Sequence, residues 1–141
     1  MCVGTRIAVV GSGMIPDCAQ RAEVLGRLRE AGKTVVEITE EQVAAFAGNC
    51  IELSGRGGVQ HLAMSQTAHA AFTHEQLDTI RETAAVLPVP VPTIEQAGGS
   101  VRCMIAGNHL ERRSDTGPKG PAESVGAARH PHERVSATAF I

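Results

Sequence analysis

Residues 50–65 of the chain read CIELSGRGGVQHLAMS, and this stretch decides how the fold is interpreted. Two apolar runs, 50–54 and 59–65, are separated by Gly55-Arg56-Gly57-Gly58. Short apolar runs joined by a glycine-rich connection are typical of a β-hairpin. The centre of the chain is therefore predicted to contain two antiparallel strands.

The pattern inside the hairpin predicts which side chains are buried. Ile51 and Leu53 alternate with polar residues, so one face of the first strand is expected to point into a core. Leu62 and Met64 are expected to supply the matching apolar face from the second strand.

Downstream of the hairpin, Thr73 and Gln76 form a capping-box pattern, which predicts a helix bearing Leu77 and Ile80. The following apolar run, 87–91, contains two prolines, which confine it to a sheet edge or an irregular extended segment. A final strand is predicted over residues 101–106.

Upstream of the hairpin, residues 6–10 and 34–38 are predicted to be strands around a helix that begins near Pro16 and ends at Gly32. Thr39 and Gln42 form a second capping box before a short helix. The chain is thus a mixture of helices and strands, with a weak indication of an internal duplication of about fifty residues.

Composition excludes several classes of function. The 141 residues have the size of one domain, and only 2% of them are aromatic, which disfavours recognition of bases or sugars by stacking. The formal charge of −2 is spread without a basic stripe, so no nucleic-acid partner is expected. No secretory leader or membrane-spanning segment is evident in this sequence, and we expect a cytoplasmic protein without a membrane partner.

The four cysteines contain no Cys-x-x-Cys pair, so neither disulfides nor a structural metal site is expected. A glycine-rich turn at Gly11-Ser12-Gly13 imitates a dinucleotide-binding fingerprint, with Glu37 on the next strand. Pro16 occupies the third glycine position, and a hairpin follows where parallel units should continue. Nicotinamide binding is therefore disfavoured, and no cofactor is predicted.

The remaining candidate is Gly98-Gly99-Ser100-Val101-Arg102-Cys103-Met104. Two glycines permit backbone geometry that other residues avoid, and Cys103 follows them. Residue chemistry alone leaves two alternatives open for Cys103, a nucleophile or a structural thiol.

Three segments favour the first alternative: MCVGT at residues 1–5 with the strand after it, FAGN at 46–49, and the long stretch from LAMS at 62–65 to CMIA at 103–106. On these segments the chain resembles the hydrolases of the amidinotransferase and arginine deiminase superfamily, specifically the citrulline-utilisation type. The resemblance covers about residues 1–113.

The resemblance implies a pentein-like α/β propeller, in which small sheet-and-helix units surround a narrow substrate channel. The chain would supply about two of five ββαβ modules, as the C-terminal half of the propeller over residues 1–113, and residues 114–141 are predicted to be a flexible tail. Cys103 would be the catalytic nucleophile, on a strand near the channel mouth. Asn49 would be a substrate-binding residue, although an asparagine after a glycine is equally typical of a turn that bonds its own backbone.

The implied chemistry is attack of Cys103 on the central carbon of a guanidino or ureido substrate, loss of an amine or ammonia, and release of the adduct by water or by a second amine. Citrulline, arginine and methylated arginine all remain open as substrates, as do hydrolase and transferase activity.

Members of the superfamily are about twice as long, and their catalytic histidine and substrate-binding carboxylates precede the segment matched by residues 1–5. The chain is therefore expected to be truncated and inactive alone, with a homodimer or a separate N-terminal fragment as possible partners. None of the histidines matches the catalytic position: His61, His69, His74, His109, His130 and His132. The alternative is a non-enzymatic interaction or regulatory remnant of the same fold.

Overall fold

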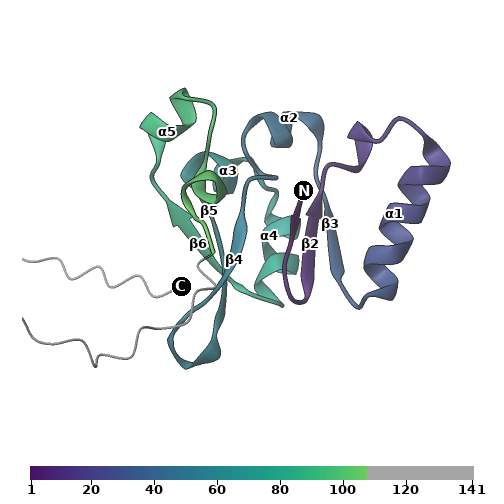
Figure 1. Ribbon diagram of the computed structural model, residues 1–141, viewed down its shortest axis with the longest axis horizontal. Coiled ribbons are helices and arrows are strands. Elements are labelled where there is room, and N and C mark those ends of the chain that lie inside the picture. The colour runs from purple at the N-terminus through teal and green to yellow at the C-terminus, as the bar shows by residue number, and fades with distance from the viewer. Residues whose placement is uncertain (108–141) are drawn as a thin grey trace, which may run out of the picture. The chain divides into compact units, whose positions relative to one another are not determined.

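The computed structural model describes residues 1–107, which contain two three-stranded mixed sheets (Figure 1). The first sheet has the order β1 (Cys2–Val3), β2 (Ile7–Val10) and β3 (Thr34–Glu37). The second has the order β4 (Ile51–Ser54), β5 (Gln60–Ser65) and β6 (Ala85–Val89). Residues Met1–Ala106 form one compact unit.

Helices and 3-10 turns connect these strands. The first sheet carries the turn η1 (Ser12–Met14) and the helices α1 (Cys18–Glu30) and α2 (Glu40–Ala44). The second carries the turn η2 (Arg56–Gly58) and the helices α3 (Gln66–Ala71), α4 (His74–Arg81) and α5 (Pro92–Gln96), and it is followed by the turn η3 (Val101–Met104).

The two sheets share one topology. In each, the first two strands pair antiparallel, helix follows, and the third strand pairs parallel with the second. This repeat agrees with the predicted internal duplication. The architecture is a small mixed α/β fold that is compatible with a partial pentein fold.

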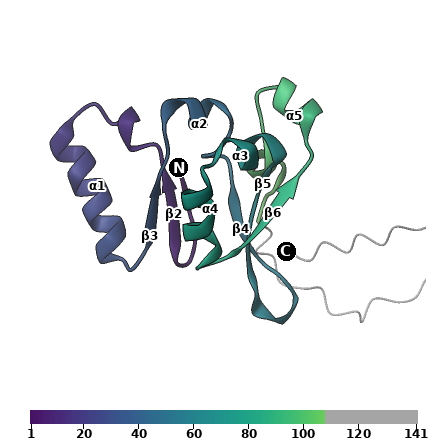
Figure 2. The same cartoon turned by 180° about the vertical axis from the view of Figure 1, so that it is seen from behind.

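One apolar core joins the two sheets. Its members come from both sheets, from α3 and α4, and from the connection before β4; they are Cys2, Ile7, Val9, Val36, Ile38, Ala47, Cys50, Leu62, Met64, Ala68, Phe72, Leu77, Ile80 and Ala84. Helix α4 contacts both β3 and β6, and the view from behind shows it over the junction of the sheets (Figure 2). A smaller cluster of Ala8, Val10 and Leu25 holds α1 on the other face of β2.

Both predicted capping boxes are present and are joined to each other. The side chains of Thr39 and Thr73 accept from the backbone amides of Gln42 and Gln76, and each glutamine closes its own box. Gln42 Nε2 also donates to Gln76 Oε1 at 2.7 Å, and Gln76 Nε2 donates to the Glu37 carbonyl at 2.8 Å. The starts of α2 and α4 are thereby tied to the end of β3.

The hairpin is confirmed, but its predicted register is wrong. Leu62 lies opposite Glu52, and Ile51 lies opposite Ala63. Directly opposed residues share a face, so Leu62 packs on the side of Glu52 rather than on the side of Ile51. The sequence pattern misled because both faces of β5 are covered: Leu62, Ala63 and Met64 are all buried.

The predicted strand over residues 101–106 is also wrong, because residues 101–104 form the turn η3. The Cys103 amide donates to the Ser100 carbonyl at 3.0 Å, and the Arg102 amide donates to Asn49 Oδ1 at 3.1 Å. These backbone donors are satisfied by the turn and by one side chain, so no partner strand is needed.

Several smaller predictions can be compared with the fold. Residues 87–89 of the run with two prolines belong to β6, which is an edge strand as expected, and Pro90 follows its end. Asp17, not Pro16, starts α1, and its carboxylate accepts from the Gln20 amide at 2.8 Å. Strand β1 and the helices α3 and α5 were not predicted.

The predicted boundary at residue 113 and the predicted tail over 114–141 lie outside the described residues. Among residues 1–107, no helix combines the length and the apolar character needed to cross a membrane.

Candidate functional site

The two site residues predicted from the sequence, Cys103 and Asn49, lie in contact although 54 positions separate them. Asn49 Nδ2 donates to Cys103 Sγ at 3.1 Å. The other end of the same amide, Oδ1, accepts from the Arg102 backbone amide at 3.1 Å. Asn49 therefore holds both the thiol and the turn that carries it.

Asn49 also lies in a turn, as the alternative interpretation proposed. Its backbone amide donates to the Phe46 carbonyl at 2.8 Å, and Phe46 adopts a positive φ of 65°. The side chain, however, does not bond its own backbone. The turn directs the amide of Asn49 toward Cys103 instead.

The Cys103 side chain is exposed, and its hydrogen bonds favour the thiolate. Hydrogen bonding from Asn49, and then from the Ser100 backbone, lowers the pKa of the Cys103 thiol, with a smaller contribution from the positive charge of Arg102. A lowered pKa increases the fraction of thiolate, which is the nucleophilic form. In a strand, the side chains of Arg102 and Cys103 would point to opposite faces. In the turn η3 they do not have to, so the positive charge of Arg102 can favour the Cys103 thiolate.

Glycines shape the approach to this turn. Gly98 has a φ of +84°, a left-handed conformation that favours glycine. A β-carbon at Gly99 would lie 3.5 Å from Cys103 Cβ and 3.5 Å from Ile94 Cγ2, so the chain passes close to the cysteine here. The prediction that two glycines prepare an unusual backbone is confirmed at Gly98.

A second polar cluster connects α5 to Ser100, the residue before η3, and no sequence pattern predicts it. Glu95 of α5 accepts from Thr67 Oγ1 at 2.7 Å and from Ser100 Oγ at 3.5 Å. Hydrogen bonds from the side chains of Ser65, Thr67 and Ser100 lower the pKa of Glu95, so its carboxylate is favoured in the charged form. The residues come from three separate segments, and no periodic pattern relates them.

No histidine among residues 1–107 hydrogen-bonds to Cys103. His61 Nδ1 lies 3.0 Å from the Val59 carbonyl in the hairpin, whereas His69 and His74 lie in α3 and α4. Three further candidates lie outside the described residues: His109, His130 and His132. The described contacts thus supply an activated thiol but no proton acceptor for it.

The other cysteines are in different environments. Cys2 and Cys50 are buried in the core, and the hydrogen bond with Cys2, followed by burial, raises the pKa of Cys50 and favours the neutral thiol. Cys18 is exposed at the start of α1. Within the described part of the chain, no group of three or more ligand-type side chains could hold a metal ion.

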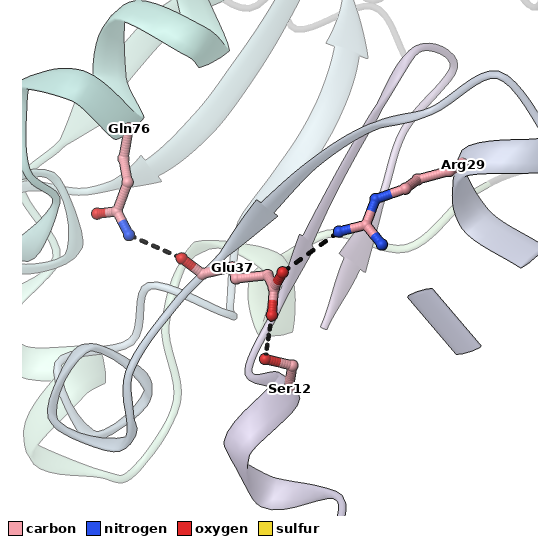
Figure 3. Close-up of polar contacts among 4 residues, drawn as sticks. All are labelled: Ser12, Arg29, Glu37 and Gln76. Atoms are coloured by element: carbon pink, nitrogen blue, oxygen red, sulfur yellow. Dashed lines mark hydrogen bonds and ion pairs between the residues drawn. The ribbon is translucent and has the colours of Figure 1, made fainter. Parts of the chain in front are cut away.

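Ser12 of the glycine-rich turn Gly11-Ser12-Gly13 contacts the Glu37 carboxylate (Figure 3). Ser12 Oγ donates to Glu37 Oε2 at 2.5 Å, and Arg29 Nη2 lies 3.4 Å from Glu37 Oε1. The carboxylate of Asp17 caps the start of α1, the position where a phosphate would have to bind.

A family model supplies the assignment. The model for eukaryotic N,N dimethylarginine dimethylhydrolases matches residues 1–110, which include both Asn49 and Cys103. The chain belongs to the N,N dimethylarginine dimethylhydrolase family. No curated protein and no solved structure shows a significant match to the chain.

Membership of the dimethylarginine dimethylhydrolase family confirms the resemblance to the amidinotransferase superfamily. The match also runs through every strand of both sheets and through η3. The contacts of Asn49 and Cys103 therefore lie within the part of the chain that matches the family model.

Proposed function

We propose that the chain is a guanidino-modifying hydrolase in which Cys103 is the nucleophile. The observation that carries this proposal is the hydrogen bond from Asn49 Nδ2 to Cys103 Sγ, made to an exposed thiol whose pKa is lowered. Thiolate formation at a solvent-accessible position is what covalent catalysis by cysteine requires. The family name points to N,N-dimethylarginine as the first substrate to test.

The proposed reaction begins with the Cys103 thiolate attacking the central guanidinium carbon. A C–S bond forms, the C–N bond to the dimethylamino group breaks, and dimethylamine leaves after accepting a proton. Water then attacks the same carbon, the C–S bond breaks, and a ureido product and the free thiol result. Citrulline-type or arginine-type substrates would follow the same two steps with ammonia as the leaving group.

Asn49 has a defined role in this scheme. Its amide donates to the sulfur, which stabilises the thiolate before attack, and its Oδ1 holds the Arg102 amide so that the turn keeps its place. An amide cannot act as a proton acceptor at this step. A base is still required for the leaving amine and for water.

We infer that this base, and the carboxylates that bind the cationic substrate, come from outside residues 1–107. The contacts of Cys103 within that range include no histidine or carboxylate. A separate polypeptide would contribute them. Low activity of the isolated chain is the consequence, because a thiolate without its proton-transfer partner loses most of its rate enhancement.

The test is a single-turnover assay with enzyme in excess over N,N-dimethylarginine, followed by detection of dimethylamine and of the ureido product. We expect slow product formation that Cys103→Ser abolishes. Cys18→Ser is the matched control, because it removes the other exposed thiol and should change nothing. Equal product formation by Cys103→Ser and by the unchanged chain would refute the role of Cys103.

The non-enzymatic alternative is favoured by the absence of a base among the described contacts of Cys103. It is separated from the proposal by thiol reactivity. A remnant has no reason to keep an activated thiol, so it would show Cys103 and Cys18 reacting with iodoacetamide with the same pH dependence.

A further inference from the structure

The polar cluster at Glu95 contacts Ser100, the residue just before the turn that carries Cys103. Its carboxylate contacts hydroxyls from two places: Thr67 in the first turn of α3, and Ser100, which immediately precedes η3. Glu95 itself belongs to α5. One side chain thus connects α3, α5 and the start of η3.

The two serines of this cluster are fully buried, at 0% exposure for both Ser65 and Ser100. Buried hydroxyls need partners, because an unsatisfied polar group in the interior is costly. Ser65 Oγ accepts from the Ala68 amide at 3.0 Å and so caps α3. Its hydroxyl proton remains available as a donor, and the Ser65 side chain is among the groups that lower the pKa of Glu95.

Ser100 relates this cluster to the thiol. The Ser100 carbonyl accepts from the Cys103 amide at 3.0 Å and closes η3, while its hydroxyl points to Glu95. The position of Ser100 therefore determines where the turn begins. Any displacement of Ser100 would move Cys103 Sγ relative to Asn49 Nδ2.

We propose that Glu95 is a positioning residue for Cys103, acting through Ser100 and anchored by Thr67. Asn49, two residues before β4, holds η3 through its side chain, and Glu95 of α5 holds it through Ser100. This inference rests on the proposed function, because it assigns Glu95 to the nucleophile of that reaction. Glu95 does not contact the sulfur in this arrangement and so is not itself catalytic.

The experiment measures the rate of iodoacetamide alkylation of Cys103 against pH, by peptide mass spectrometry on the full chain. Cys18 in the same molecule is the internal reference for exposure and reagent. Arg102 is the charged group that acts on Cys103 in the described residues, and it is left unchanged in every variant. This readout does not require turnover, so it stays informative even where hydrolysis is undetectable.

Glu95→Ala removes the hydrogen bonds that Thr67 and Ser100 donate to the carboxylate. We expect alkylation of Cys103 at neutral pH to fall roughly two- to fivefold and its midpoint to move to higher pH, with Cys18 unaffected. Glu95→Gln keeps the shape and one carbonyl oxygen, so it should restore most of the rate. Gln96→Ala, at an exposed neighbour on the same helix, is the matched control and should behave as the unchanged chain.

Thr67→Val tests the anchor independently and covers the case in which Glu95→Ala does not fold. It should move the pH profile of Cys103 alkylation in the same direction as Glu95→Ala, because the hydroxyl that anchors Glu95 is lost. Thr67 is exposed and loses only this hydroxyl, so the fold should be retained. An unchanged Cys103 profile in Glu95→Ala, or in Thr67→Val where Glu95→Ala does not fold, overturns the proposal. So does an equal change in Gln96→Ala.

Failure of this inference can be told apart from failure of the proposed function. If Glu95 has no positioning role, the variants leave the profile of Cys103 unchanged while Cys103→Ser still abolishes product formation. If Cys103 is not the nucleophile, product formation survives Cys103→Ser whatever the Glu95 variants do to alkylation.

Discussion

The Asn49 side chain has two roles: it stabilises the sulfur of Cys103, and it fixes the backbone next to it. The donor and acceptor of one planar amide are used at the same time, toward Cys103 Sγ and the Arg102 amide. Replacement of that amide should therefore change both the charge state and the position of the thiol.

The first prediction is that Asn49→Ala slows alkylation of Cys103 at pH 7 by roughly two- to tenfold, because the hydrogen bond that lowers the thiol pKa is lost. Above pH 10 the two alkylation rates should converge, since Cys103 is then ionised in the variant and in the unchanged chain. Iodoacetamide kinetics followed by peptide mapping measure this. Identical pH profiles for Asn49→Ala and the unchanged chain would count against Asn49 as the activating group.

A second prediction at this scale concerns the pH dependence contributed by Glu95. Its pKa is lower in the folded protein than the ordinary value of 4.5, so the carboxylate stabilises the fold above pH 4.5. That contribution is lost as the pH falls from 4.5 through the folded pKa. Thermal unfolding of Glu95→Gln should therefore show a shallower fall in Tm between pH 5 and pH 3 than the unchanged chain.

The control for this measurement is Glu82→Gln, which makes the same change of charge at an exposed position. The Glu82 side chain has no hydrogen-bond partner within residues 1–107. Its Tm should fall with pH as steeply as that of the unchanged chain. Parallel curves for both variants would show that Glu95 gains nothing from its hydroxyl contacts.

At the scale of elements, the end of α1 offers a sharp comparison between two glycines. Gly32 lies two residues after the end of α1 and has a φ of +73°. Its amide donates to the Arg29 carbonyl in the last turn of the helix. Gly26 lies inside the same helix. A β-carbon at either position would meet no atom within 4 Å, so the two sites differ in backbone conformation and not in available space.

The third prediction follows from that difference. Gly32→Ala should destabilise the protein by about 1 kcal/mol, because alanine disfavours the left-handed region. Gly26→Ala should stabilise it by about 0.5–1 kcal/mol, because glycine is a poor helix former. Urea unfolding of both variants gives the two free energies. Changes of the same sign at both positions would contradict the assigned end of α1.

Local signals account for the parts of these elements that sequence analysis predicted correctly. The capping boxes at Thr39 and Thr73 depend on residues three positions apart, and the edge position of β6 agrees with Pro88 within it and Pro90 just after it. The hairpin register and the turn η3 were wrong because they depend on remote partners: burial of both faces of β5, and the Asn49 side chain 53 residues before Arg102. The Glu95 cluster was missed for the same reason.

For the candidate site, physical reasoning from the sequence reached only a possible nucleophile at Cys103, and resemblance supplied Asn49. Neither revealed that the two residues touch. Their contact arises because β4 begins two residues after Asn49 while η3 packs against β5, the partner of β4. This relation exists only once the second sheet has formed.

At the scale of the whole unit, the four cysteines divide into an inner and an outer pair. Cys2 and Cys50 belong to the core shared by both sheets, and their exposures are 1% and 0%. Cys18 and Cys103 are exposed. Alkylation can therefore report on the surface and on the core of the same molecule.

The last prediction is that iodoacetamide modifies Cys18 and Cys103 in the native protein, while Cys2 and Cys50 react only through global unfolding. Cys2 lies in the first sheet and Cys50 immediately before the second, so a single cooperative unit should expose both together. Their protection should fall in parallel as urea is added, with one midpoint that coincides with the loss of helical signal in circular dichroism. If Cys2 became reactive well before Cys50, the first sheet would open alone, and the core that joins the two sheets would not hold them as one unit.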